Sequence, residues 1–303
     1  REGWKTMVKE LAPQSPEGDY LRPDSQLKAP AGTTMQLREG GHAVYVGNTC
    51  PWCHRVRLAL TLRQVLETFI SAVQLLDDPE RASRGGWAFD PQRGFKDPVF
   101  DAADLREVYD VSASGGKGYV GRCTAPLLVD RSGQAVSNDS AQIVRFITSA
   151  RGPGDSWVDL FPASHQADIE ATNIWTYELC NSCYRAGFAT SQAAFERAAR
   201  DAAAGLARAD ALLAERRFLC GDRVTEADVM LLPCASRFDA VYASLFLRGS
   251  VGLLRERPNL RRWLAECWAL PGVRDTVNVK ACQQSYYSTL FPLNPSQIVS
   301  PWE

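Results

Sequence analysis

One short segment, CPWC at 50–53, most constrains what this chain can fold into. The apolar run over 42–47 lies just before it and predicts a β-strand. Apolar residues at helical spacing follow it, from Val56 to Leu66, and predict an amphipathic helix. A further apolar run over 69–76 predicts the next strand. The order is therefore strand, turn with two cysteines, helix and strand.

The position of the first cysteine predicts a reactive thiol. Cys50 would lie at the amino end of the helix, where unpaired backbone N–H groups and the helix dipole favour a thiolate. Pro51 suits the first turn because its missing N–H would bond nothing there. Cys53 lies one turn further on and faces the helix body, so we expect it to be less exposed. Cys50 is the predicted nucleophile and Cys53 a candidate resolving thiol, in a thioredoxin-like fold.

Two later segments fit the same fold. Pro126 introduces a strand that runs to 130, and a proline at this place in a thioredoxin-like fold is typically cis. Such a proline exposes the backbone of Ala125, which can pair with a peptide substrate. Asp139 and Ser140 precede a predicted helix, where free N–H groups suit a carboxylate and Asp139 suits an ammonium group. Simple capping of the helix is the alternative explanation.

The second half of the chain predicts helices. Residues 166–215 are rich in Ala, Glu and Leu, and Thr225 begins a variant capping box. Pro258 begins another helix, whereas the tail from Ser285 is expected to be irregular. The predicted fold class is α/β plus all-α, a thioredoxin-like domain followed by a helical bundle. The expected boundaries are an extension over 1–38, the thioredoxin-like domain over 39–155 and the helical domain over 164–303.

Charge and cysteine content narrow the function further. The chain has 34 basic and 35 acidic residues, which gives no long-range field for nucleic acid or an anionic membrane. No apolar stretch approaches the roughly 18 residues of a membrane span. Nine scattered cysteines indicate free thiols in a reducing compartment, so we expect the cytoplasm or a chloroplast stroma. The chain starts at Arg1 rather than Met, which leaves room for a targeting segment already removed.

A second cysteine pair raises the alternative of a zinc site. Cys180 and Cys183 have the spacing of half a four-cysteine site, with 50–53 as the other half. They stand in a helical pattern without a knuckle glycine, however. We therefore interpret them as small helix-packing residues and predict no metal site.

Several segments together resemble one class of glutathione transferases, the Xi class, whose members are glutathionyl-hydroquinone reductases. The resemblance extends over roughly 40–300 and combines motifs that would not decide alone. They are GGWAFD at 85–90, YVGRCTAP at 119–126, SNDSA at 137–141, YRAGFA at 184–189, RFDAVY at 237–242, and YY at 286–287 with NP at 294–295. The resemblance implies glutathione as co-substrate and a homodimer.

The resemblance also implies roles for individual residues. Cys50 matches the nucleophilic cysteine. The expected glutathione contacts are Trp87, Arg122, Cys123, Ala125, Pro126, Asp139 and Ser140. Tyr184, Tyr286 and Tyr287 match tyrosines that line the acceptor pocket, where Tyr184 or Tyr286 would donate a proton to the acceptor ring. Trp87 could instead cap an apolar patch, and the tyrosines could be packing residues with wet hydroxyls.

The chain departs from the Xi pattern at Cys53, where alanine is usual, and a CPWC version resembles the Iota class of photosynthetic organisms. The expected activity is removal of glutathione from conjugates such as glutathionyl-hydroquinones, through a Cys50–glutathione mixed disulfide. A glutaredoxin-like or dehydroascorbate reductase that uses Cys50 and Cys53 is an alternative. A glutathione-ligated iron–sulfur module is a further one. The acceptor would be a small aromatic molecule or a disulfide.

Overall fold

The computed structural model describes residues 12–30, 32–35, 38–65, 68–150, 158–290 and 293–299. The chain splits into two compact units. One comprises Asp24–Leu160 with Asp275–Val277, and the other comprises Arg1–Pro23, Phe161–Arg274 and Asn278–Glu303. The first is built around a sheet and the second from helices, which is the α/β plus all-α class that the sequence predicts.

A mixed sheet of five strands, in the order β3-β2-β1-β4-β5, forms the centre of the first unit. Its strands are β1 (His42–Gly47), β2 (Ile70–Asp77), β3 (Trp87–Ala88), β4 (Leu127–Asp130) and β5 (Ala135–Ser137). β1 runs parallel to β2 and antiparallel to β4, with Tyr45 opposite both Val73 and Leu127. β3 and β5 are antiparallel to their neighbours. β1 is central because its apolar run is buried on both faces.

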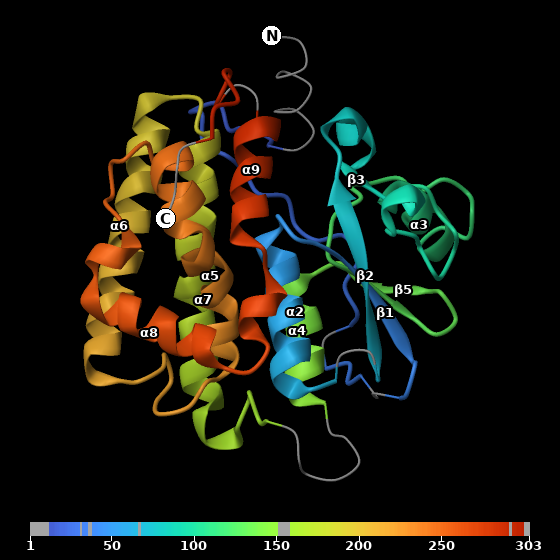
Figure 1. Ribbon diagram of the computed structural model, residues 1–303, viewed down its shortest axis with the longest axis horizontal. Helices are drawn as coiled ribbons and strands as arrows, with labels where there is room; N and C mark the ends of the chain where they lie inside the picture. Colours follow the sequence, from blue (N-terminus) through green and yellow to red (C-terminus); the bar gives the residue numbers. More distant parts are fainter. Residues whose placement is uncertain are drawn as a thin grey trace. The chain divides into compact units, whose positions relative to one another are not determined.

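Helices cover the sheet of this unit (Figure 1). α2 (Pro51–Arg63) and α4 (Ser140–Ser149) pack side by side, and α3 (Leu105–Ser112) contacts β3. The long connection over 78–118 also contains two short turns of 3₁₀ helix, η1 (Pro79–Arg84) and η2 (Pro91–Arg93). The carboxyl end of β1 is connected to the start of α2 by the short turn that leads into the CPWC segment.

The helical unit contains α5 (Gln166–Phe188), α6 (Gln192–Glu215), α7 (Glu226–Arg237), α8 (Pro258–Ala269) and α9 (Val279–Thr289). The shorter turns are η3 (Ala163–His165), the π-helical η4 (Phe238–Phe246), η5 (Leu254–Glu256) and η6 (Val273–Thr276). α5 packs along α6 and α7, and α9 packs on η4. Gly205 lets α6 approach α5, because a Cβ there would lie 2.9 Å from Leu179.

α7 and η4 together form the continuous helical segment Glu226–Phe246. By length and composition alone, this segment is long and apolar enough to cross a membrane. Its apolar window is 89% buried inside the structure, as in the core helix of a folded domain. The capping box predicted at Thr225 is confirmed, with the Asp228 side chain accepting from the Thr225 backbone. α7 and η4 therefore belong to the buried core of the helical unit.

The local predictions hold at most elements. The strand over 42–47 is confirmed, as is the cis bond between Ala125 and Pro126. The expectation of an irregular tail from Ser285 is wrong, because α9 continues to Thr289. Asn278 caps this helix by accepting from Ala281 N at 2.9 Å, and Cys282, Tyr286 and Tyr287 are its buried face. Leu66 and residues 151–157 lie outside the described residues.

The expected extension over 1–38 makes specific contacts where it is described. Gln14 donates to the Phe188 carbonyl at 3.0 Å within the helical unit. Ala29 exchanges two hydrogen bonds with the Gln142 side chain, at 2.9 and 2.8 Å, within the sheet unit. The described part of the segment is thus divided between the two units near residue 23.

Candidate functional site

Cys50 is the N-cap residue of α2. Its backbone N–H donates to the Gly47 carbonyl at 3.3 Å, which closes the turn after β1. Its sulfur accepts from Cys53 N at 3.4 Å and, as a thiol, donates to the Ala125 carbonyl at 3.5 Å. The sulfur is thus held at the positive end of a helix beside the segment of the cis proline, and such a position favours a thiolate nucleophile.

Cys53 differs from Cys50 in exposure. Its side chain is 0% exposed, as expected for a residue that faces the helix body, whereas Cys50 is partly exposed. The next two residues are also buried: His54 Nε2 lies 2.8 Å from Thr276 Oγ1, and the Arg55 guanidinium lies 4.4 Å from the centre of the Trp52 ring. Of the two thiols of the CPWC turn, Cys50 is the accessible one.

Trp87 packs directly against the turn that carries Cys50. It stands on the edge strand β3, and its ring lies so close to Gly47 that a Cβ at Gly47 would be 2.1 Å from Trp87 Cζ3. Only glycine fits there, because any side chain would overlap the ring. The partly buried indole therefore forms a wall at the end of β1.

Gly47→Ala should displace the Trp87 ring and destabilise the sheet unit by about 1–3 kcal/mol through overpacking. Chemical unfolding, with quenching of tryptophan fluorescence as a second readout, measures both effects. The matched test adds Gly47→Ala to a Trp87→Ala chain. In that chain, which lacks the ring, Gly47→Ala should lower the unfolding free energy much less. Equal costs in both backgrounds would contradict the packing of Trp87 on Gly47.

The residues before the cis proline have distinct environments. Arg122 N donates to Gln26 Oε1 at 3.2 Å, and Arg106 Nη1 lies 3.8 Å from the Cys123 sulfur. Burial raises the pKa of the Cys123 thiol to about 11, against the lowering effect of Arg106. Cys123 is therefore a neutral thiol near pH 7, and its place in the site is structural.

Alkylation should separate these thiols. At pH 7.5 a small excess of iodoacetamide should modify Cys50 well before Cys123, by at least about tenfold in rate, because the thiolate is the reacting form. Peptide mapping by mass spectrometry over a time course measures the two rates. Cys123, rather than Cys50, as the first modified residue would contradict this assignment.

Asp139 is the N-cap of α4 and accepts from Ala141 N at 3.0 Å and Gln142 N at 3.1 Å. The capping explanation is thus confirmed for one of its oxygens. The other oxygen, Oδ2, lies 3.0 Å from the ammonium group of Lys28. The same carboxylate therefore caps the helix and holds an ammonium group, and Ser140 follows as the first helical residue.

Topology places these groups at one end of the sheet. The carboxyl end of β1 pairs with the amino end of β4, and Leu128 of β4 pairs with Ser137 at the carboxyl end of β5. Trp87 pairs with Asp77 at the carboxyl end of β2, which runs parallel to β1. The expected site residues of the sheet unit, apart from the buried Cys53, thus lie at the same end of the sheet as Cys50. They are Trp87, Arg122, Cys123, Ala125, Pro126, Asp139 and Ser140.

The predicted tyrosines belong to the helical unit. Tyr184 OH lies 2.5 Å from Tyr286 OH and 3.3 Å from Tyr242 OH, so three tyrosines from α5, α9 and η4 form one cluster. Tyr287 is not part of it, because its hydroxyl lies 2.5 Å from Ser244 Oγ. Tyr242 was not singled out from the sequence, although it ends the RFDAVY segment at 237–242 that carries the resemblance.

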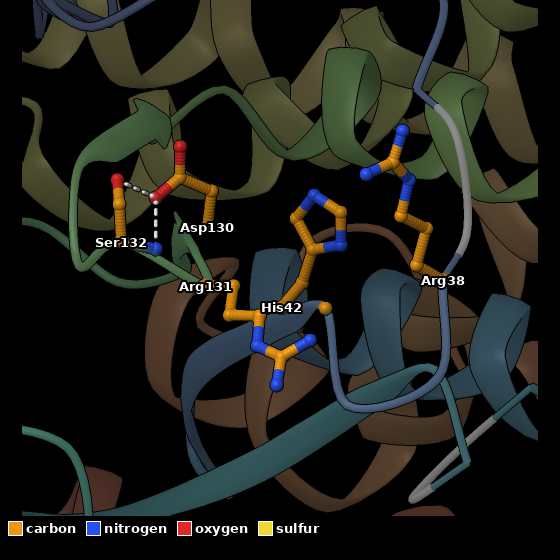
Figure 2. A pocket seen from close by; sticks show the side chains of 6 residues that line it. Arg38, His42, Asp130, Arg131 and Ser132 are labelled. Carbon is orange, nitrogen blue, oxygen red and sulfur yellow. Dashed lines mark hydrogen bonds between the residues drawn. The ribbon is translucent and has the colours of Figure 1, made fainter.

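A cavity of about 300 Å³ lies at the other end of β1 (Figure 2). Arg38, His42 and Arg131 line it together with Asp130, whose carboxylate accepts from the Ser132 backbone and hydroxyl. Burial lowers the pKa of His42, against the raising effect of Asp130. No predicted site residue lines this cavity, and it is at the wrong end of the strand for Cys50 chemistry.

Comparison with known proteins agrees with this fold and site. Residues 49–150 match the N-terminal domain model of glutathione S-transferases, and 192–266 match the C-terminal domain model. The glutathionyl-hydroquinone reductase YqjG of Escherichia coli strain K12 is 34% identical over 281 residues, which cover 90% of this chain and 84% of that protein.

Solved structures give the same result. The Xi glutathione transferase of Phanerochaete chrysosporium superposes with a TM-score of 0.83 at 29% identity, over 93% of this chain and 97% of that one. The glutathione-bound YqjG of Escherichia coli K-12 gives a TM-score of 0.79 at 30% identity, over 95% of each chain. The fold and the cysteine at the helix start define a cysteine-type thiol enzyme, and this chain belongs to the glutathione transferase family. Within that family it is a Xi-like enzyme.

Proposed function

We propose that this enzyme removes glutathione from glutathionyl-hydroquinones and related conjugates through a mixed disulfide on Cys50. The placement of Cys50 carries the proposal, since its sulfur is the accessible thiol of the turn and accepts from the amide at the start of α2. The relative YqjG is named a glutathionyl-hydroquinone reductase, and the similarity to it covers nine-tenths of this chain. A thiolate at such a helix start is a good nucleophile toward sulfur.

The reaction has two steps. The Cys50 thiolate attacks the glutathione sulfur of the conjugate, and the carbon–sulfur bond breaks with its electron pair on the acceptor ring. The ring takes up a proton and leaves as the hydroquinone, so that Cys50 is left disulfide-bonded to glutathione. A second glutathione thiolate then attacks this disulfide, which releases oxidised glutathione and restores the Cys50 thiolate.

The glutathione site is proposed at the sheet end described above. Trp87 would lie against glutathione, Ala125 would pair with its cysteinyl unit through the backbone, and Arg122 would contact it. The Asp139 carboxylate is suited to the γ-glutamyl ammonium, because it already holds the Lys28 ammonium at 3.0 Å. The YqjG structure with bound glutathione supports this class of ligand for the family.

The direct test is incubation of the protein with a glutathionyl-hydroquinone and then with glutathione. Mass spectrometry of the first stage should locate a single glutathione adduct on Cys50. Chromatography of the second stage should show hydroquinone and oxidised glutathione in equal amounts. An adduct on another cysteine, or turnover without any adduct, would overturn the mechanism.

Cys53→Ala decides between a monothiol and a dithiol mechanism. Because Cys53 is buried, we expect the variant to keep hydroquinone reductase activity within about twofold, and the lifetime of the Cys50 adduct to stay unchanged. Steady-state kinetics and adduct mapping measure both quantities. A fall of tenfold or more in every activity would instead support the glutaredoxin-like alternative, in which Cys53 resolves the mixed disulfide.

The finer parts of the proposal concern setting and assembly. We propose a small aromatic or disulfide acceptor, a homodimer and a reducing compartment. All nine cysteines are free thiols in the structure, which supports the last of these. Light scattering coupled to size-exclusion chromatography tests the dimer.

A further inference from the structure

Asn138 is the residue of the SNDSA segment to which the proposed reaction gives no role. It lies between the end of β5 and Asp139, and it is only 5% exposed. Its backbone N–H donates to the Leu27 carbonyl at 2.9 Å, and its backbone carbonyl accepts from Ser25 Oγ at 3.4 Å. The side-chain oxygen and nitrogen also have partners. Asn138 is therefore a buried polar residue whose hydrogen-bond partners are all supplied by the chain.

The side-chain amide of Asn138 can face only one way. Its Oδ1 accepts from Leu27 N at 3.1 Å, and a backbone N–H can only donate, so the oxygen must lie on that side. Its Nδ2 donates to the Tyr109 hydroxyl at 2.9 Å and, at 3.4 Å, to Thr124 Oγ1. The Tyr109 hydroxyl in turn donates to the Thr124 carbonyl at 2.7 Å. A continuous chain of hydrogen bonds thus leads from Leu27 through Asn138 to Thr124.

These bonds link two segments of the proposed glutathione site. Thr124 immediately precedes Ala125, whose carbonyl lies 3.5 Å from the Cys50 sulfur. Asn138 immediately precedes Asp139, the N-cap of α4. In the proposed site, the Ala125 backbone pairs with the cysteinyl unit of glutathione, and Asp139 holds its γ-glutamyl ammonium. The groups proposed to bind the two parts of one ligand are therefore joined by the hydrogen bonds of Asn138.

A fixed spacing between two such groups favours a ligand that reaches both. The second contact then forms with little further loss of entropy, because the binding groups are already in place. The pairing of β4 with β5 cannot supply this spacing alone, since its last pair is Leu128 with Ser137, short of either binding group. The bonds from Asn138 to Thr124 and Tyr109 extend the link beyond the strands.

We propose that Asn138 is a positioning residue that sets the spacing between the cysteinyl and γ-glutamyl subsites, and so selects ligands that occupy both. The inference rests on the proposed function, and it adds the residue that matches the site to the length of glutathione. The γ-linkage of glutathione inserts two methylene groups between its first amide and the glutamyl α-carbon, so the ligand has a defined reach. Leu27 gives the segment before β1 a part in the same spacing.

The test compares two unreactive thioethers. S-methylglutathione reaches both subsites, whereas S-methylcysteinylglycine lacks the glutamyl unit. Asn138→Ala should raise the Kd of S-methylglutathione about tenfold and that of the shorter ligand by less than about twofold. Calorimetry measures the first Kd and an NMR titration the second. The control Gln134→Ala, at an exposed amide earlier in the same segment, should leave both values within about twofold. An equal loss on both ligands in Asn138→Ala would overturn the proposal.

Tyr109→Phe tests the same chain of hydrogen bonds at its next member. The variant keeps the ring but removes the hydroxyl that donates to the Thr124 carbonyl. It should also weaken S-methylglutathione more than the shorter ligand. The double variant should lose less than the product of the two single losses, because both changes break one chain. If Asn138→Ala fails to fold, equal binding of both ligands by Tyr109→Phe and the wild type would refute the proposal.

Steady-state kinetics separates this inference from the proposed function. Asn138→Ala should raise KM for a glutathionyl-hydroquinone about tenfold and leave kcat within about threefold, because Cys50 keeps its place at the start of α2. Asn138-dependent binding of S-methylglutathione, without turnover of any conjugate by the wild type, would refute only the proposed function. Normal turnover by the wild type, with the ratio of the two Kd values unchanged in Asn138→Ala, would refute only the role of Asn138.

Discussion

Cys50→Ser should lower turnover of every glutathione conjugate by about a thousandfold or more, because it removes the sulfur that forms the mixed disulfide. The serine hydroxyl would still accept from Cys53 N at the start of α2, so the fold of the turn is preserved. Steady-state kinetics on a glutathionyl-hydroquinone, together with adduct mapping after exposure to oxidised glutathione, measure the loss. The expected result is loss of both turnover and adduct, with no change in the unfolding transition.

The matched control is Cys180→Ala. Cys180 is a buried thiol of α5, whose sulfur lies 4.0 Å from the Met230 carbonyl, and it has no part in the proposed chemistry. This variant should keep full activity per folded molecule and lose a small amount of stability. Activity in Cys50→Ser within tenfold of the wild type would show that another group breaks the carbon–sulfur bond.

Cys50, Pro126 and the Asp139 cap were predictable because their signals are local, whereas Trp87, Arg122 and Cys123 were expected only from the resemblance. A cysteine pair directly after a strand specifies a helix start, and Pro51 and the cap geometry follow from single-residue chemistry. The proline of the Ala125–Pro126 pair and the Asp139 cap are likewise set by neighbours in sequence. These features survive folding unchanged because they need no distant partner.

The remaining features depend on contacts between distant residues. The approach of Trp87 to Gly47 joins positions 40 residues apart, and nothing in either segment shows it. The tail from Ser285 was expected to be irregular because of the prolines beyond it, but the structure has the helix α9 there. The helical spacing of Cys282 and Tyr286 was the signal that indicated this helix. The π-helix of η4 follows an apolar run that reads as ordinary α-helix, and it brings Tyr242 into the cluster.

Asp228→Ala should destabilise the enzyme by about 3–5 kcal/mol, the second large effect that we expect. The Asp228 carboxylate is fully buried and accepts from Thr225 N at 2.8 Å, Leu219 N at 3.0 Å and Trp263 Nε1 at 2.8 Å. Removal of the carboxylate leaves three buried N–H donors and the Thr225 hydroxyl without this acceptor, and each such N–H donor costs about 1–3 kcal/mol. The total is smaller than the sum of these costs, because the loop can move so that some of the freed donors bond to water.

Urea unfolding and the change in Tm measure this cost, and two variants divide it. Trp263→Phe removes one donor together with its bond and should cost about 1–2 kcal/mol, less than Asp228→Ala. Asp222→Ala, at an exposed position six residues earlier, should shift the midpoint by no more than about 0.5 kcal/mol. If Asp228→Ala lowered the unfolding free energy no more than Asp222→Ala does, the carboxylate would not be the group that fixes the chain before α7 and anchors it to α8. The large expected difference arises because the same carboxylate caps α7, fixes the backbone at Leu219 and anchors Trp263 of α8.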